Sequence, residues 1–206
     1  MITYEKGRIF LFFALSFWWT ALNANNERAP QSPPFEENSA LQLRLENYQA
    51  TIDEIKASHG EFSIQLLEPL QGLGRTLKEQ GREEDATEVL NHAIHLLRRN
   101  EGVYTPKQLD LINELTEISI GGDKPLKANK QKEFSYFISS RSHGEDSLKL
   151  IPATYELVKW YMRTGQLRKS MELLERTLDT MESGGWKNEP GLIEAHLMLA
   201  NVKRLR

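Results

Sequence analysis

The sequence predicts an all-α fold, an α-solenoid of antiparallel helix hairpins with about eight helices. From residue 38 onward, apolar residues recur at spacings of three and four, and the alternation typical of strands is nearly absent. Short glycine-containing breaks separate these segments, and Gly60, Gly102 and Gly144 follow one another at a constant interval of 42 residues. A fixed interval of this length is typical of stacked helical repeats, because one helix pair cannot bury its own apolar face.

The composition favours a globular domain and excludes several classes of function. The chain has 206 residues, of which 39% are hydrophobic and 27% charged, as expected of a folded domain. A formal net charge of -3 and the lack of a basic stripe with interleaved aromatics do not favour a nucleic-acid partner. Cysteine is absent, which excludes disulfides, thiolate metal sites, cysteine nucleophiles and the lipid-bearing cysteine of a lipoprotein.

The first 24 residues follow the order of regions in a secretory signal peptide. Lys6 and Arg8 precede an apolar run over residues 9–21, and the small residue Ala24 stands just before a polar stretch. A positive region, an apolar region and a small residue at the cleavage point are the parts of an export signal. We therefore expect cleavage after Ala24 and an exported mature protein, periplasmic in a Gram-negative bacterium and otherwise secreted.

Two other interpretations of this segment are open. It can stay uncleaved as a membrane anchor, or it can form a buried helix of the folded domain. The apolar run is shorter than the roughly 20 residues that span a bilayer, which favours cleavage. Residues 25–37 combine three prolines with polar residues and are expected to form an extended linker, so the folded domain is expected over residues 38–206.

The folded domain divides into one leading helix, three helix hairpins and one trailing helix. The leading helix corresponds to the second helix of a pair, and its apolar residues are Leu45, Tyr48, Ile52 and Ile55. Turns inside the three hairpins are expected at Gly81, Asp123 and Gly165, and the trailing helix is expected over residues 191–206.

Hydroxyl residues mark the expected start of each hairpin. Ser63, Thr105 and Ser147 recur at the 42-residue interval, and their side chains can accept hydrogen bonds from the free N–H groups of a helix start. Pro106 follows Thr105 at a first helical position, where its missing N–H costs nothing. Apolar residues on the same interval are Leu67, Leu109, Ile151 and Ile193, and Leu73, Leu115, Leu157 and Leu199.

The first hairpin carries the clearest repeat pattern. It reads Leu70-x-x-Leu73-Gly74-x-x-Leu77-x-x-x-Gly81-x-x-x-x-Ala86-x-x-x-Leu90-x-x-Ala93. This order of large and small residues resembles the tetratricopeptide repeat (TPR). Gly74 and Ala86 are expected to let the two helices approach closely, and Gly81 is expected to end the first helix with a positive φ. Replacing Ala86 by leucine would overpack that contact.

The resemblance covers about residues 40–206, and the long interval is similar to the variety found in kinesin light chains and in exported bacterial TPR arrays. The second hairpin departs from the pattern, because Lys132 stands where an apolar core residue is expected. Phe134, Tyr136, Phe137 and Ile138 can repack around it. In the third hairpin small residues again occupy the close contacts, with Ser170 and Thr177 at those positions.

The resemblance implies a non-catalytic scaffold that binds a peptide or protein in a groove lined by the first helix of each pair. Projected onto this sequence, the groove residues are Gln71, Arg75, Lys78, Asn113, Glu117, Tyr155, Lys159, Arg163 and Asn201. This polar, net-basic strip resembles the surfaces on which related arrays hold acidic or carboxylate-terminated peptides. Two alternatives stay open: a solvated face that binds nothing, and an accessory subunit of an envelope complex held in the membrane by an uncleaved N-terminal helix.

No motif for catalysis or for a cofactor is present, so we expect neither an enzyme nor a cofactor. His92 and His95 with Glu88 have a spacing that a metal site could use, but a solvated helix face is the preferred interpretation. His196 is expected to pack in the last helix. Trp186 is expected to pack in a turn, with an exposed anchor for a partner as the alternative.

Overall fold

The computed structural model describes residues 35–186 and 189–205, with the side chains from residue 38 onward, and these residues form eight α-helices. Their bounds are α1 (Phe35–His59), α2 (Leu67–Glu79), α3 (Glu83–Glu101), α4 (Leu109–Gly121), α5 (Pro125–His143), α6 (Ile151–Arg163), α7 (Leu167–Ser183) and α8 (Pro190–Leu205). The expected signal peptide and most of the expected linker lie outside the described residues. Helix α1 begins at Phe35, so the last residues assigned to the linker are helical.

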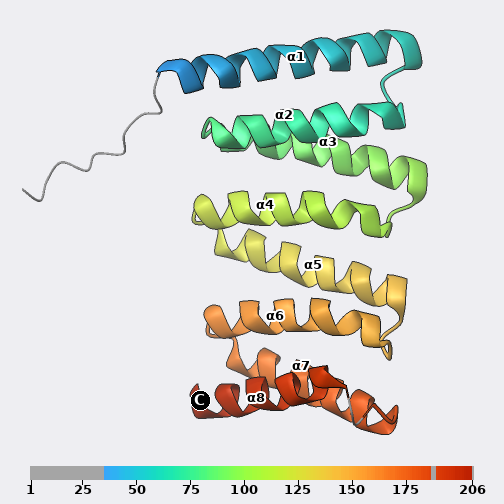
Figure 1. Cartoon of the computed structure of the whole chain (residues 1–206), viewed down its shortest axis with the longest axis vertical. Helices are drawn as coiled ribbons and strands as arrows, with labels where there is room; N and C mark the ends of the chain where they lie inside the picture. Colours follow the sequence, from blue (N-terminus) through green and yellow to red (C-terminus); the bar gives the residue numbers. More distant parts are fainter. Residues whose placement is uncertain (1–34, 187–188, 206) are drawn as a thin grey trace, which may run out of the picture. The chain divides into compact units, whose positions relative to one another are not determined.

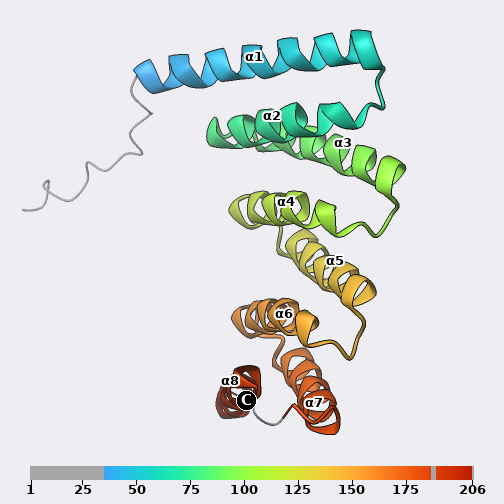
Figure 2. The same ribbon diagram turned by 45° about the vertical axis from the view of Figure 1, so that its right-hand side comes forward.

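Residues 41–206 form one compact unit, in which the helices lie in two layers. Helices α2, α4, α6 and α8 follow one another in one layer, and α3, α5 and α7 form the other (Figures 1 and 2). Each first helix pairs with the second helix that follows it, and each second helix also contacts the next first helix. The predicted α-solenoid of antiparallel hairpins is therefore confirmed, and the described part of the chain contains no strand.

The 42-residue interval is kept in the backbone. Helices α2, α4 and α6 each have 13 residues, and a short 3-10 turn precedes each of them. Ser63 accepts a hydrogen bond from the Gln65 N–H at 3.3 Å, and Ser147 accepts one from the Lys149 N–H at 3.2 Å. The predicted caps are thus confirmed at these two positions, although they close the 3-10 turn and not the α-helix itself.

Thr105 does not cap, which corrects the prediction for the second hairpin. Its hydroxyl donates to the Oε2 atom of Glu101 at 3.1 Å, and the same carboxylate binds Lys107 at 2.7 Å. The side chain is oriented to make this charge-assisted hydrogen bond with Glu101, and its oxygen accepts no hydrogen bond from an N–H of the turn that follows. Pro106 follows at the first position of the turn, as predicted.

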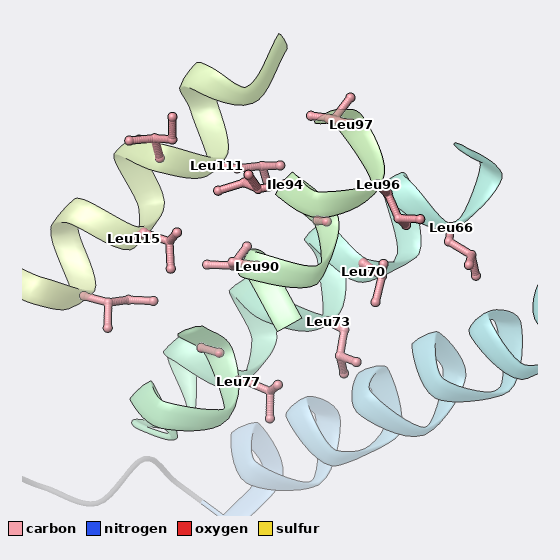
Figure 3. Packing of buried hydrophobic residues seen from close by; sticks show 14 of the residues in the cluster. Leu66, Leu70, Leu73, Leu77, Leu90, Ile94, Leu96, Leu97, Leu111 and Leu115 are labelled. Atoms are coloured by element: carbon pink, nitrogen blue, oxygen red, sulfur yellow. The ribbon is translucent and has the colours of Figure 1, made fainter. Parts of the chain in front are cut away.

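The first core confirms the close helix approach expected from the repeat pattern. A Cβ atom at Gly74 would lie 2.7 Å from Cδ2 of Leu90, so only glycine fits between α2 and α3 at this point. Leu90, Ala86 and Ala93 are fully buried. Figure 3 shows leucines of α2 and α3 meeting those of α4 in this cluster. Gly81 follows α2 with a φ of +76°, as predicted.

The buried apolar residues of the described part fall into two clusters that divide at α5. The first gathers residues of α1 to α4 and takes only Ile138 from α5, and the second gathers residues of α6 to α8 and takes only Ala128. Lys132 is half-buried at the position that Leu90 holds one repeat earlier. Of the residues expected to repack there, Ile138 is buried, but Phe137 is exposed at the surface.

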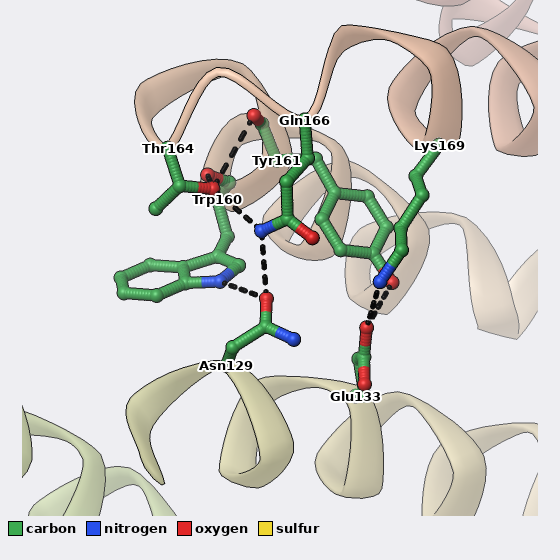
Figure 4. Close-up of polar contacts among 7 residues, drawn as sticks. All are labelled: Asn129, Glu133, Trp160, Tyr161, Thr164, Gln166 and Lys169. Carbon is green, nitrogen blue, oxygen red and sulfur yellow. Dashed lines mark hydrogen bonds and ion pairs between the residues drawn. The ribbon is translucent and has the colours of Figure 1, made fainter. Parts of the chain in front are cut away.

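Hydrogen bonds add to the apolar contacts of Ala128 and Tyr136 where α5 meets α6 and α7 (Figure 4). Asn129 accepts from the indole N–H of Trp160 at 3.0 Å and from the amide of Gln166 at 2.8 Å. Glu133 accepts from the Tyr161 hydroxyl at 2.9 Å and from Lys169 at 2.8 Å. Trp160 is therefore buried with its polar atom paired.

Helix α8 is displaced by one residue from the 42-residue interval. Its buried residues Ala195, Met198 and Val202 lie 41 positions after the buried Thr154, Leu157 and Tyr161 of α6. The expected equivalence of Ile193 and Leu199 with the earlier apolar positions is therefore wrong by one residue, and Ile193 is exposed. His196 is exposed as well, 3.9 Å from Glu182, and does not pack as expected.

Among the residues that the structure describes, no helix is both long enough and apolar enough to cross a bilayer. The apolar run at residues 9–21 lies outside that part.

Candidate functional site

The exposed and partly exposed side chains of α2, α4, α6 and α8 form a continuous surface, here called the first-helix surface. It comprises Gln71, Arg75 and Lys78 of α2, Asn113, Glu114 and Glu117 of α4, Glu156, Lys159 and Arg163 of α6, and Ile193, Leu197 and Asn201 of α8. The first helices lie in one layer, so their equivalent positions line up across the array (Figure 2). Eight of the nine predicted groove residues lie on this surface.

The cations of α2 are paired with carboxylates of α4. Arg75 binds Oε1 of Glu114 through its Nε at 2.7 Å and its terminal nitrogen at 2.6 Å, and the hydrogen bond with Glu114 raises the pKa of Arg75. Gln71 donates to the same oxygen at 3.3 Å, and Lys78 pairs with Glu117. The net positive charge expected of this surface is therefore balanced on α2 by the glutamates of α4.

Glu114 is the residue of this surface that the sequence analysis missed. Its side chain is only 15% exposed, because Arg75 and Gln71 cover it. Two features could have identified it, namely its place next to Asn113 and its separation from Arg75 by almost one repeat. Two oppositely charged residues at that separation lie on neighbouring first helices, where they can pair.

Positive charge is less fully compensated on α6. Lys159 lies 3.5 Å from Glu156 on the same helix, both side chains are largely exposed, and such pairs add little stability. Arg163 is exposed, and its guanidinium lies 5.4 Å from the centre of the Trp160 ring. This end of the first-helix surface therefore offers two cationic side chains to a ligand.

Tyr155 is not a surface residue, which corrects one predicted groove position. It is 5% exposed, and its hydroxyl donates to the carbonyl oxygen of Gly191 at the start of α8. Burial, with a smaller contribution from Glu194, raises its pKa to about 12. The position that is half-exposed as Gln71 on α2 is thus covered by α8, and Tyr155 acts as a packing residue.

Helix α8 adds apolar side chains to this surface. Ile193 is 67% exposed and Leu197 is 62% exposed, and both stand one turn apart on the same side of the helix. Asn201 is exposed nearby, and its Oδ1 atom accepts a weak hydrogen bond from Arg204 at 3.5 Å. Two neighbouring exposed aliphatic residues form a small apolar contact point beside the cations of α6.

The histidines of α3 differ in their surroundings. His92 is partly buried, and burial, followed by the nearby charge of Lys56, lowers its pKa. His95 is exposed. No group of three or more potential metal ligands occurs among the described residues. Trp186 is half-buried in the turn before α8, and its ring lies close to Gly184.

Comparison with known proteins shows similarity at the level of the fold. No protein-family model and no curated protein matches the chain. The chain is similar to a solved structure of kinesin light chain TPR-like repeats from Podosopora anserina, with a TM-score of 0.60 and 17% identity over 82% of this chain and 81% of that one.

A variant of the same repeats gives a TM-score of 0.58 at 18% identity, over 82% of this chain and 80% of that one. BtubC (BKLC) from P. vanneervenii gives a TM-score of 0.50 at 14% identity, over 81% of each chain. These similarities, together with the two-layer array, show that the chain has the TPR-like repeat fold that its first hairpin indicated.

Proposed function

We propose that this protein is a non-catalytic scaffold that binds a peptide or protein segment along the first-helix surface. One observation carries the proposal: four successive first helices present exposed polar, charged and aliphatic side chains in one layer. A continuous surface of this kind suits an extended ligand better than a small molecule, which needs a deep pocket. The TPR-like fold supports the proposal by analogy only.

The chemistry of the surface favours a ligand that is acidic over α6 and apolar over α8. Lys159 and Arg163 supply positive charge, and Ile193 and Leu197 supply the apolar contact. The cations of α2 contribute less, because Glu114 and Glu117 already pair with them. Charge-assisted contacts with Arg163 would orient the ligand, and burial of the aliphatic side chains would add affinity.

Site-specific photo-crosslinking tests this surface directly. A benzophenone amino acid placed at Asn113 or at Leu197 should capture the same partner from the compartment in which the protein resides. The same reporter at Arg168 is the control, because this residue is highly exposed on α7 in the other layer. Capture of one partner from the two first-helix positions but not from Arg168 supports the proposal, and equal capture from all three positions contradicts it.

Charge reversal then tests the acidic character of the ligand. Lys159→Glu combined with Arg163→Glu should reduce capture at least about tenfold, which corresponds to ~1.4 kcal/mol of binding free energy. Reversal of Arg75 is less informative, because it would place two carboxylates together at Glu114. Lys127→Glu combined with Arg168→Glu is the matched control with the same change of net charge. Unchanged capture by the first variant would exclude an acidic ligand at this surface.

We also propose that the scaffold works outside the cytoplasm, in the periplasm if the source is Gram-negative. The support is the order of charged, apolar and small residues in the first 24 positions. The alternative is an accessory subunit of an envelope complex, anchored by an uncleaved N-terminal helix. N-terminal sequencing of the mature protein separates the two, since Asn25 as the first residue supports export and an intact Met1 supports the anchor.

A further inference from the structure

Three equivalent grooves lie on the side of the array opposite the first-helix surface. Each is bounded by two successive second helices and floored by the first helix between them: α1 and α3 over α2, α3 and α5 over α4, and α5 and α7 over α6. Their volumes are about 410, 630 and 530 Å³. Ile112 and Leu115 floor the middle groove, whereas Asn113 and Glu117 of the same helix face the first-helix surface.

The three grooves are repeats of one site at the 42-residue interval. Leu73, Leu115 and Leu157 occupy the same floor position in turn. On the walls, Glu88 of the first groove, Lys130 of the second and Glu172 of the third are likewise equivalent. The three grooves thus share one backbone geometry while the charge of their lining side chains differs. They can therefore be compared directly with one another.

The first groove is acidic. Its charged lining residues are Glu46, Asp85, Glu88 and one cation, Arg82, and that cation is already paired with Asp85 at 2.7 Å. An anionic ligand would meet uncompensated negative charge there, and like charges brought together are unfavourable.

The third groove carries equal numbers of acids and cations, and its cations are already used. Lys169 binds Glu133 at 2.8 Å, and Arg176 donates to the Tyr136 hydroxyl at 3.1 Å. A ligand could bind either cation only by breaking one of these contacts, which costs free energy.

The middle groove alone is cationic without an acid in its lining. His95 and Arg98 of α3 and Lys130 of α5 carry its ionisable groups. The Arg98 guanidinium is held in place by a 2.8 Å hydrogen bond to Gln108 and by the Phe134 ring, whose centre is 5.3 Å away. Lys130 is exposed and forms no ion pair with any residue that the structure describes. Lys130 is thus free to bind an anion, and the exposed His95 ring can donate a hydrogen bond to it.

The rest of the middle groove suits a peptide with an apolar side chain. Ile94, Ile112 and Leu115 are buried and form an apolar floor, and the half-buried Phe134 adds to its wall. The Oε1 atom of Gln131 is buried without a hydrogen-bond partner, which leaves an acceptor whose lost hydration is not compensated until a donor meets it. A peptide backbone brings N–H donors to this acceptor, and a fatty-acid chain does not.

We propose that the groove between α3 and α5 is a second docking site, which takes a short acidic peptide segment with one large apolar side chain. The apolar side chain would lie on Ile112 and Leu115, the acidic side chains would meet His95 and Lys130, and the backbone would donate to Gln131. The site lies on a different face from the first-helix surface and does not depend on the function proposed for that surface.

Fluorescence polarisation with labelled octapeptides tests the proposal on the purified full chain. The panel contains peptides with four acidic residues and one leucine in varied order, the same peptides with lysine in place of the acids, and the same peptides with serine in place of leucine. We expect at least one acidic, leucine-containing peptide to bind at least about tenfold more tightly than both of its counterparts. Equal binding of the acidic and basic peptides would overturn the proposal.

Matched variants locate the binding. Lys130→Glu should weaken the best peptide at least about tenfold, and Glu172→Lys, at the equivalent position of the next groove, should leave its affinity unchanged. Both side chains are exposed, so neither change threatens folding. The first-helix variant Lys159→Glu with Arg163→Glu should also leave the affinity unchanged, so failure here and failure of the proposed function are distinguishable. An affinity that is insensitive to Lys130→Glu would overturn the site.

A final arm separates a peptide from a lipid. Vesicles of phosphatidylglycerol are mixed with the wild-type chain and with Lys130→Glu, and co-sedimentation is measured. No difference between the two chains supports the peptide site. Sedimentation that depends on Lys130, without binding of any peptide in the panel, would overturn the proposal in favour of an anionic lipid.

Discussion

Asp123 takes a left-handed backbone conformation, with a φ of +50°, at the position that Gly81 holds one repeat earlier with a φ of +76°. A side chain costs roughly 1–2 kcal/mol in this region, and aspartate tolerates it better than most residues. Asp123→Gly should therefore raise the free energy of unfolding by up to about 1 kcal/mol, measured by urea denaturation. Gly165→Ala, at the next equivalent turn, should lower it. A lower stability of Asp123→Gly would show that the aspartate side chain itself stabilises the turn.

Ala86 tests the close contact between α2 and α3. It is fully buried, and Ala86→Leu adds a side chain where Gly74 and Leu90 leave no space. The free energy of unfolding should fall by about 1–3 kcal/mol. Ala200→Leu is the control, because Ala200 is exposed on α8, and it should change stability by less than about 0.5 kcal/mol. Equal effects of the two substitutions would argue against a tight helix contact.

The ion pair between Arg75 and Glu114 can be used to measure how much contacts within the first-helix surface contribute to the free energy of unfolding. A double-mutant cycle with Arg75→Met and Glu114→Gln should give a coupling energy of up to about 1 kcal/mol, because Arg75 is half-exposed. The coupling should shrink at 1 M sodium chloride, where charges are screened within about 3 Å. The measurement is urea denaturation at two salt concentrations, and a coupling that is independent of salt would indicate a contact dominated by packing.

The ionised carboxylate of Glu133 is expected to make a pH-dependent contribution to the stability of the fold. Burial favours its neutral form, but the hydrogen bonds from Lys169 and Tyr161 outweigh this and hold its pKa below the ordinary 4.5. A carboxylate with a lowered pKa stabilises the fold fully above its unfolded pKa and loses that effect as the pH falls through the folded value. The stability advantage of wild type over Glu133→Gln should therefore be present at pH 7 and decrease progressively as the pH is lowered below 4.5.

Urea denaturation over this pH range checks this, with Glu172→Gln as a control on the neighbouring helix. An advantage that stays constant as the pH is lowered through the acidic range would show that the contacts of Glu133 do not depend on its charge.

The repeat geometry could be predicted from the sequence because glycine and apolar residues mark it locally. A positive φ at Gly81 follows from the residue type and its place after a helical pattern, whatever the rest of the chain does. The same reasoning placed Asp123 in an equivalent turn. By contrast, Thr105 does not cap, because its side chain is oriented to donate to Glu101, and only the folded turn brings Glu101 near.

The errors in the candidate site arose where neighbouring helices decide exposure. A constant 42-residue interval predicted that Tyr155 lies on the surface. Helix α8 begins one residue earlier than this interval requires, and the carbonyl group of its Gly191 covers the Tyr155 hydroxyl. The basic strip was inferred from first helices taken one at a time, and Glu114 neutralises Arg75 only when α2 and α4 lie side by side. The grooves between second helices were missed because each depends on three helices.

The division of the apolar core at α5 has a mechanical consequence. Apart from Ala128 and Tyr136, α5 is joined to the C-terminal helices by the hydrogen bonds of Asn129 and Glu133, and neither apolar cluster continues through α5. A chain stretched between its ends in an optical trap would therefore part first next to α5. It would lengthen in two separate steps, and the block containing Leu90 and the block containing Leu174 would each unravel as a unit.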